Sequence, residues 1–238
     1  MMQVIAPVAD VLGATGRERQ VLLGTEITVQ STQGDRSVVT TAHCYAGDML
    51  TAKIGEAAAP THMVGTLATH AYRAEDMKSG DLMHLPFGAR VTVLDERQKF
   101  FETNVGYVPK KHLRPLDRPF ADPATIAQMH FGVPYLWGGD STLGIDCSGL
   151  VAAALRACAI TCPDDSGPQK DQLGHDATGD YQRGDLVFWK GHVGMMVDGD
   201  TMIHANAHHM ATVYEPIENA ILRIKAQGDG EVTAHKRL

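Results

Sequence analysis

Residues 135–157 constrain the fold most, because they join a glycine-broken loop to an apolar helix with a cysteine at the junction. Asp146 precedes the apolar run and is a residue type that caps helix starts. Apolar residues then recur at the spacing of one helix face, at Cys147, Leu150, Val151, Ala154, Leu155 and Cys158. The pattern predicts a helix that begins at Cys147.

A cysteine in the first turn of a helix lies among backbone N–H groups that have no partner within the helix. Those groups and the helix dipole favour an anion, so the thiol of Cys147 should lose its proton more readily than a free cysteine. This position suits a catalytic nucleophile. The alternative interpretation is a small, buried apolar residue, which is the commoner use of a lone cysteine.

A hairpin downstream supplies two histidines. Residues 192–197 indicate a buried strand, 198–200 a turn and 201–205 a returning strand. A three-residue turn places His192 and His204 on the same face as diagonal cross-strand neighbours. One imidazole would then act as the base for a thiol, and the second would orient the first.

The composition of the chain indicates which classes of partner it is not expected to bind. The 238 residues carry a net charge of −7, with 44% hydrophobic and 21% charged residues. Nucleic acid requires a basic face, and an acidic protein is repelled by anionic membranes, so we expect neither partner. We also expect no metal and no cofactor, because paired Cys-x-x-Cys ligands are absent from the sequence.

The beginning of the sequence has no basic segment followed by a long apolar run, and four cysteines fit a reducing compartment. We therefore expect a cytoplasmic protein. Cys158 and Cys162 are close enough in sequence for a disulfide across the helix end, although buried thiols are the expected state.

The first 118 residues show short strand-like runs broken by glycine, with a faint internal repeat. Residues 21–29 align with residues 85–93, which places Gly24 over Gly88, and residues 45–49 correspond to 104–108. Two copies of about 60 residues with several short strands each suggest two small β-barrels. Segments 57–61 and 114–119 suit short linkers.

Five ordered motifs resemble the NlpC/P60 cysteine peptidases: Tyr135-Leu-Trp-Gly-Gly, Asp146-Cys-Ser-Gly-Leu-Val, Gly184-Asp-Leu-Val-Phe-Trp, His192-Val-Gly and Ile203-His-Ala. The resemblance covers about residues 120–215. It implies an α+β fold with a papain-like catalytic domain. The amino-terminal half is similar to bacterial SH3 domains, although Asp48 stands where that family has an aromatic residue. The expected domains are 1–58 and 59–118 (SH3-like) and 119–238 (peptidase).

Within the third domain we expect a short helix over 122–130, a central helix that stops near Cys162-Pro163, and a loop-rich segment over 163–184. Five strands should follow, over 186–189, 193–197, 201–206, 212–217 and 221–226. A helix packed on an antiparallel sheet is the α+β arrangement.

We expect Cys147 to be the nucleophile, His192 the base, and His204 the group that orients His192. The resemblance implies a substrate-binding role for Tyr135, Asp146, Ser148, Asp165 and Ser166, with Tyr45 and Asp10 closing the pocket from the first SH3-like domain. Asp146 has helix capping as its alternative role, and Trp137 is expected in the core. His204, His208 and His209 suggest a metal site only weakly, since loop histidines are commonly solvated.

The function implied by the resemblance is a cysteine endopeptidase that cleaves the γ-D-glutamyl-L-diamino acid bond of murein (peptidoglycan) peptides with a free amino-terminal L-Ala, through a thioester. Its partner would be a murein peptide recycled in the cytoplasm. Three alternatives stay open at this point. They are an exported wall hydrolase of the same chemistry, a non-catalytic peptidoglycan-binding protein, and an acyltransferase or amidase of a related fold.

Overall fold

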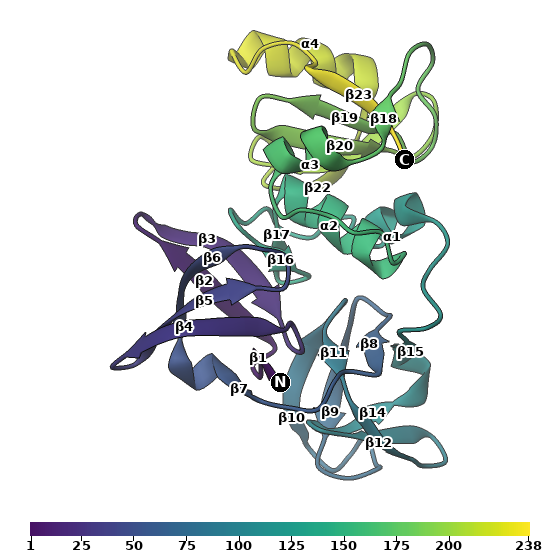
Figure 1. Cartoon of the computed structure of the whole chain (residues 1–238). Coiled ribbons are helices and arrows are strands. Elements are labelled where there is room, and N and C mark those ends of the chain that lie inside the picture. The colour runs from purple at the N-terminus through teal and green to yellow at the C-terminus, as the bar shows by residue number, and fades with distance from the viewer. The chain divides into compact units, whose positions relative to one another are not determined.

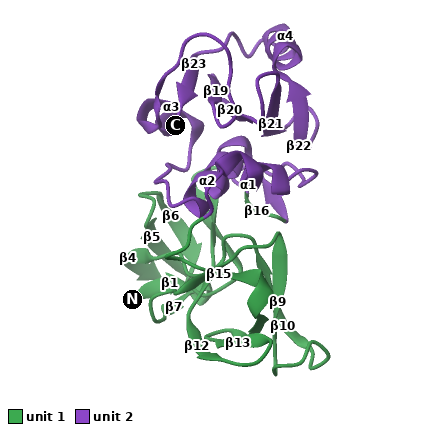
Figure 2. Cartoon of the chain, turned by 90° about the vertical axis from the view of Figure 1, so that its right-hand side faces the viewer, with its two compact units in different colours: residues 1–119, 140–142 green, residues 120–139, 143–238 purple.

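The computed structural model describes residues 1–238, which divide into two compact units. The first unit comprises residues 1–119 with 140–142, and the second comprises 120–139 with 143–238 (Figure 2). The predicted boundary between residues 118 and 119 lies beside this division. The boundary between residues 58 and 59, inside the first unit, stays a prediction.

The first half of unit 1 is a five-stranded antiparallel sheet in the order β3-β2-β6-β5-β4, together with a two-stranded ribbon of β1 and β7. It contains no α-helix, as the sequence indicates. Its elements are β1 (Met2–Val4), β2 (Val8–Gly13), β3 (Gly16–Leu22), β4 (Ile27–Gln33), β5 (Arg36–Thr41), β6 (Ala46–Leu50), the 3₁₀ turn η1 (Thr51–Lys53) and β7 (Ile54–Glu56).

The second half of unit 1 repeats this plan. Its five-stranded sheet has the equivalent order β10-β9-β14-β13-β12, and β8 and β15 pair as β1 and β7 do. The elements are β8 (His62–Val64), β9 (Ala68–Tyr72), β10 (Asp81–Pro86), β11 (Arg90–Val91), β12 (Val93–Glu96), β13 (Phe100–Thr103), β14 (Gly106–Pro109), η2 (Lys110–His112) and β15 (Leu113–Pro115).

The predicted alignment of Gly24 with Gly88 is confirmed by the backbone. Both glycines adopt a left-handed conformation, with φ of 80° and 82°. The N–H of Gly24 donates to the carbonyl of Val4 at 2.9 Å, and that of Gly88 donates to the carbonyl of Val64 at 3.0 Å. A positive φ strains every residue except glycine, so the repeated turn explains the repeated residue.

The SH3 assignment of these two halves stays a prediction. The strand orders of unit 1 are open, and no sheet closes into a barrel. Asp48 and Tyr107 occupy equivalent register positions, opposite Leu12 and Tyr72 respectively. The first copy therefore has an aspartate at the position where the second copy has a tyrosine.

Unit 2 combines four α-helices with a six-stranded antiparallel sheet in the order β18-β23-β19-β20-β21-β22. The helices are α1 (Pro123–Met129), α2 (Cys147–Ala157), α3 (Ser166–Gln172) and α4 (Ile217–Gln227). The strands are β18 (His175–Asp176), β19 (Leu186–Trp189), β20 (His192–Met196), β21 (Thr201–Asn206), β22 (Ala211–Pro216) and β23 (Ala234–Arg237). β17 (Gly144–Ile145) is a further short strand of unit 2, and β16 (Asp140–Ser141) belongs to unit 1.

Helices cover both faces of the sheet of unit 2. Figure 1 shows α4 on one side and the α1–α2 pair on the other. The apolar face of α4 forms one buried cluster with side chains of β19, β20 and β21: Val187, Trp189, Met196, Met202, Ile217, Ala220 and Ile224. Burial of this apolar area fixes α4 on the sheet, and α4 carries residues of the site described below.

Two helices begin where the sequence predicts. The side chain of Asp122 accepts a hydrogen bond from Ala124 N–H at the start of α1, and that of Asp146 accepts one from Gly149 N–H at the start of α2. The end of α2 differs from the prediction, because the helix stops at Ala157 rather than near Cys162. Ala159 takes a left-handed φ of 58°, and the N–H of Ile160 donates back to Leu155, which closes the helix.

One further prediction was wrong, because the predicted strand over 221–226 lies inside helix α4. The segment 163–184 is rich in loops, as expected, and also contains α3 and β18. Ile217, Ala220, Ile221 and Ile224 have the spacing of a helix face, which outweighs the strand propensity of the isoleucines. The last strand of the sheet is β23 instead. None of the helices combines the length and apolar character that crossing a membrane requires.

Candidate active site

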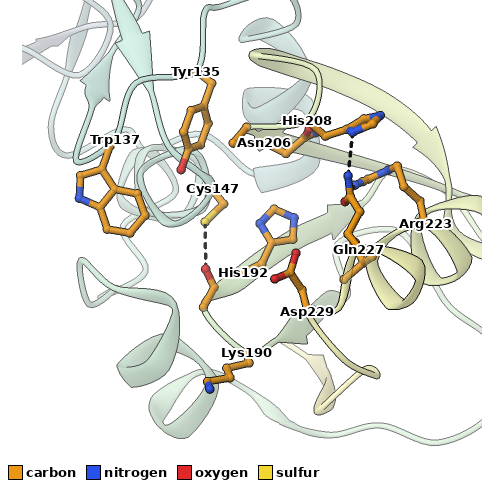
Figure 3. A pocket seen from close by; sticks show the side chains of 13 residues that line it. Tyr135, Trp137, Cys147, Lys190, His192, Asn206, His208, Arg223, Gln227 and Asp229 are labelled. Atoms are coloured by element: carbon orange, nitrogen blue, oxygen red, sulfur yellow. Dashed lines mark hydrogen bonds between the residues drawn. The ribbon is translucent and has the colours of Figure 1, made fainter.

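A pocket of about 510 Å³ in unit 2 holds the predicted nucleophile and the predicted base (Figure 3). The ends of α2, β20 and β21 and one face of α4 contribute its walls. The lining residues are Tyr135, Trp137, Cys147, Lys190, Gly191, His192, Asn206, Ala207, His208, Arg223, Ile224, Gln227 and Asp229. Cys147 is 7% exposed, and this exposure opens into the pocket.

Cys147 is the first residue of α2, as predicted. The carboxylate of Asp146 fixes the helix start, since its Oδ1 accepts from Gly149 N–H at 2.7 Å and its Oδ2 from Gly138 N–H at 3.0 Å. The Cys147 thiol lies 4.0 Å from the carbonyl of Gly191, the residue before His192. The first-turn position gives the sulfur the N–H groups and dipole that stabilise a thiolate.

The two histidines lie side by side on the predicted hairpin. The ladder between β20 and β21 pairs Met195 with Ile203, which makes His192 and His204 diagonal neighbours on one face. His192 Nε2 and His204 Nδ1 are 2.8 Å apart. His192 lines the pocket, and His204 lies fully buried behind it.

Burial holds His192 in its neutral form. Burial, together with the charges of His204 and Arg223, lowers the pKa of His192 from 6.5 to about 3, and Glu215 opposes these effects. Burial also lowers the pKa of His204 below its ordinary value, against the raising effect of Glu215. A neutral imidazole at the pocket can accept a proton from a thiol.

Sequence reasoning missed two residues behind the histidines. Glu215 Oε2 lies 3.0 Å from His204 Nε2, and Arg223 binds both oxygens of Glu215, at 2.9 and 2.7 Å. Glu215 lies on β22 and Arg223 on α4, eight residues apart. No motif marks such a pair, and the expectation of a strand over 221–226 hid the helix that brings them together.

Aromatic residues form the side of the pocket next to the sulfur. Figure 3 shows the hydroxyl of Tyr135 directed toward Cys147, with Trp137 beside it. Trp137 is 68% exposed, so the prediction that it packs in the core was wrong. Gly138 directly follows it with a φ of 69°, in a loop that leaves the indole at the surface.

The other predicted substrate residues do not line this pocket. Asp146 caps α2, and Ser148 Oγ donates to Asp146 Oδ1 at 3.1 Å. Asp165 and Ser166 begin α3, where the backbone carbonyl of Asp165 accepts from Gln169 N–H. Substrate binding by these four residues stays a prediction.

Asp10 and Tyr45 belong to unit 1. Asp10 pairs with Arg17 at 2.7 Å and accepts from Gln20 at 3.0 Å, and Tyr45 packs against the core of its half. The hydrogen bonds lower the pKa of Asp10 although burial raises it. The role of both residues in closing a pocket also stays a prediction.

One group of side chains near the pocket has the composition of a metal site. His204, His209 and Glu215 place ligand atoms within 4.8 Å of one another. Arg223 already pairs with Glu215 there, and His204 is fully buried. His208, which the sequence groups with these histidines, instead bonds to Gln227 at 2.8 Å.

Part of the chain, including this pocket, is similar to a known protein family. Residues 132–225 match the NlpC/P60 family. The matched segment contains Cys147, His192, His204 and Glu215, and it ends inside α4. It spans less than half of the chain, and the two halves of unit 1 lie outside it.

Curated relatives match the same part. The chain is 37% identical over 92 residues to a γ-D-glutamyl-L-lysine dipeptidyl-peptidase of Bacillus cereus and 39% identical over 82 residues to the protein of that name from Bacillus subtilis. These alignments cover 35% and 31% of this chain and 28% of each relative. The peptidoglycan endopeptidase RipB of Mycobacterium tuberculosis is 31% identical over 111 residues, which is 40% of this chain and 46% of that protein.

Solved structures extend the likeness to the whole chain. An NlpC/P60 family protein from Bacillus cereus superposes with a TM-score of 0.84 over 100% of this chain and 99% of its own, at 21% identity. NlpC2 from Trichomonas vaginalis gives a TM-score of 0.50 over 99% of this chain and 96% of its own, at 15% identity. The first likeness shows that the fold of this chain also occurs in a solved protein.

Proposed function

We propose that this chain is a cysteine endopeptidase that cleaves the γ-D-glutamyl-L-diamino acid bond of short murein peptides with a free amino-terminal L-Ala. The observation that carries the proposal is a thiol at a helix start that shares one pocket with a neutral, hydrogen-bonded histidine pair. The family match and the names of the relatives support the reaction class and the bond.

The reaction would proceed by acyl transfer to sulfur. His192 accepts the proton of the Cys147 thiol, and the sulfur attacks the γ-carbonyl of the D-glutamyl residue. The C–N bond breaks, His192 returns the proton to the leaving amine, and a thioester remains on Cys147. Water then attacks the thioester with His192 as the base, which releases the γ-carboxylate and restores the thiol. A backbone N–H at the start of α2 and the Tyr135 hydroxyl are the proposed donors to the oxyanion.

Defined peptides test this proposal. The protein is incubated with L-Ala-γ-D-Glu-L-Lys and with the corresponding diaminopimelate peptide, each with a free or an acetylated alanine amine. The products are identified and quantified by mass spectrometry. We expect release of the free diamino acid and at least about tenfold slower cleavage of the acetylated peptides, because a desolvated carboxylate loses its ammonium partner. Equal cleavage of both forms, or of intact sacculi, would contradict the specificity.

The charges around the pocket suit a zwitterionic leaving group. Asp229, just after α4, and Lys190, between β19 and β20, both line the pocket. Figure 3 shows the carboxylate of Asp229 beside His192, with Lys190 further away. Neither forms an ion pair within the chain. We propose that Asp229 faces the side-chain ammonium of the diamino acid and Lys190 its carboxylate.

Replacing Asp229 by asparagine is therefore expected to raise KM for the lysine peptide by about threefold to tenfold, with little change in kcat, because a partly exposed charge pair contributes about 1 kcal/mol. Steady-state kinetics with the lysine peptide and its norleucine analogue measure the effect. The norleucine peptide should show no such change. The matched control is Glu218→Gln, which removes a charge from the other end of α4. An equal rise in KM for both peptides would exclude recognition of the ammonium.

The proposed partner is a murein peptide and the proposed compartment is the cytoplasm, with neither nucleic acid nor membrane as a partner. Fractionation of cells that express the native gene tests the compartment. Recovery of the protein in the medium or the wall would favour the exported hydrolase instead. A paired assay of turnover and binding distinguishes an enzyme from a protein that only binds peptidoglycan.

A further inference from the structure

Behind the two histidines, a buried carboxylate and a guanidinium continue the hydrogen-bonded chain away from the pocket. We propose that Glu215, held by Arg223, is a positioning residue that sets the proton positions of both histidines, so that His192 presents a bare Nδ1 to Cys147. The kinetic consequence rests on the proposed function. The proton positions themselves do not, and they can be measured without a substrate.

Glu215 is held as an acceptor. Both of its oxygens receive an N–H from Arg223, at 2.9 Å for Oε1 and 2.7 Å for Oε2. Arg223 Nη1 also donates to Gln227 Oε1 at 2.8 Å, one turn further along α4. Burial raises the pKa of Glu215, but the hydrogen bonds from Arg223 and His204 lower it well below its usual range. The side chain is therefore an ionised carboxylate, which only accepts hydrogen bonds.

A second neighbour of His204, the side chain of Asn206, favours the tautomer of His204 that carries its proton on Nδ1. Asn206 Nδ2 lies 3.1 Å from His204 Nε2. The N–H of His209 donates to Asn206 Oδ1 at 2.9 Å, which fixes the amide with its NH₂ toward His204. An NH₂ group only donates, so Asn206 alone would leave Nε2 of His204 bare and place the proton on Nδ1.

Glu215 decides between these two arrangements because a charged acceptor forms the stronger hydrogen bond. His204 Nε2 then carries the proton and donates to Glu215 at 3.0 Å, which leaves a lone pair on His204 Nδ1. That lone pair accepts the N–H of His192 Nε2 at 2.8 Å. His192 is neutral and carries its single proton there, so its Nδ1 is the nitrogen that can take the thiol proton.

Without Glu215, the hydrogen-bond partner that remains at His204 Nε2 is the Asn206 amide NH₂, which only donates. The proton of His204 would move to Nδ1 and donate to His192 Nε2. His192 would then carry its proton on Nδ1, facing Cys147, where it cannot act as a base. Loss of this one carboxylate would therefore change the tautomer of both histidines.

Glu215→Met tests the inference, because methionine has a similar volume and no acceptor oxygen. Ring nitrogen chemical shifts of ¹⁵N-histidine in the full chain give the tautomers at pH 7. In the unchanged protein we expect protonated Nε2 on both His192 and His204. In Glu215→Met we expect protonated Nδ1 on both. Unchanged tautomers in the variant would overturn the inference whether or not the protein is a peptidase.

Kinetics with the lysine tripeptide supply the second measurement. A wrong tautomer in a catalytic triad lowers kcat by up to about 10⁴-fold. Glu215 acts through one more ring, so we expect kcat to fall about 10²-fold or more, with KM within about threefold. Glu215→Asp, which restores a carboxylate, should recover the unchanged tautomers and part of the lost kcat. A Glu215→Met variant with full kcat contradicts the inference.

The chain contains a matched control. Asp185, directly before β19, binds Arg237 of β23 at 2.8 and 2.7 Å and His235 of β23 at 2.6 Å. This is the same arginine–carboxylate–histidine arrangement, away from the strands β21 and β22 that carry His204 and Glu215. Asp185→Leu should cost stability and leave the tautomers of His192 and His204 and the value of kcat unchanged. If the Glu215→Met variant does not fold, the double variant Glu215→Met, Arg223→Met is used instead, because it also removes the buried cation that has lost its partner. The tautomers of His192 and His204 are then measured in the double variant.

Discussion

Replacing Cys147 by alanine is expected to lower kcat on the lysine tripeptide by at least about 10⁴-fold while binding of the peptide is retained. Without the sulfur no thioester forms, and only direct attack of water on the γ-carbonyl remains. Removal of a nucleophile from a hydrogen-bonded triad has effects of this size. Alanine fills less space than cysteine, and the site borders a pocket, so the fold should be kept.

Three measurements belong to this prediction. Mass spectrometry of the products gives turnover, calorimetry with the same peptide gives binding, and thermal unfolding shows that the variant is folded. Cys158→Ala is the matched control, because Cys158 is a thiol at the other end of α2 and lies outside the pocket. Its kcat should stay within about twofold of the unchanged protein.

The possible results separate the functional alternatives. Binding without turnover in the unchanged protein would favour a recognition protein on the same fold. Turnover that survives in Cys147→Ala would contradict the assignment of the nucleophile. Transfer of the γ-glutamyl group to an added amine, detected by its mass, would favour an acyltransferase.

The core of the site could be predicted from the sequence because its geometry is local. A helix start is marked by its capping residue, and Asp146 does cap α2. A three-residue turn fixes the register of a hairpin, and the N–H of Val197 donates to Thr201 on either side of residues 198–200. These two rules place a thiol at a helix start and two imidazoles on one face.

The outer part of the site could not be predicted, because it depends on packing between distant elements. Glu215 reaches His204 across a strand pair, and Arg223 reaches Glu215 from a helix whose position is set by a buried apolar face. The prediction that Trp137 packs in the core also failed. An indole is usually buried, but here a loop that approaches α2 closely leaves it exposed at the pocket.

Mild acid is expected to unfold unit 2, because its buried histidines must gain protons when the chain unfolds. Burial lowers the folded-state pKa of His130, His192 and His204, to about 3 for His192. A folded pKa below the unfolded value of 6.5 means that the unfolded chain binds more protons as the pH falls below 6.5. The free energy of unfolding therefore decreases from that pH downward until each folded pKa is reached.

The expected slope follows from proton counting. Each histidine that is neutral when folded and charged when unfolded lowers the free energy of unfolding by about 1.4 kcal/mol per pH unit. Three such groups give a limiting slope of about 4 kcal/mol per pH unit, a large fraction of the 5–15 kcal/mol typical of a domain. Below about pH 4 a second effect is added, since hydrogen bonds from Arg237 and His235 hold the pKa of Asp185 at about 2 despite burial, and its stabilisation is lost between pH 4 and 2.

Tryptophan fluorescence isolates this transition, because both tryptophans of the chain, Trp137 and Trp189, lie in unit 2. Urea unfolding at pH 7, 6 and 5 gives the slope directly. His130 lies outside the pocket, at the C-terminal cap of α1. The variant His130→Gln removes one titrating group and should reduce the slope by about 1.4 kcal/mol per pH unit. This change in slope is expected even if the variant is less stable at pH 7. A urea midpoint that is the same at pH 7 and pH 5 would show that these histidines take up protons as readily in the folded protein as in the unfolded chain, and would contradict the lowering of their pKa by burial.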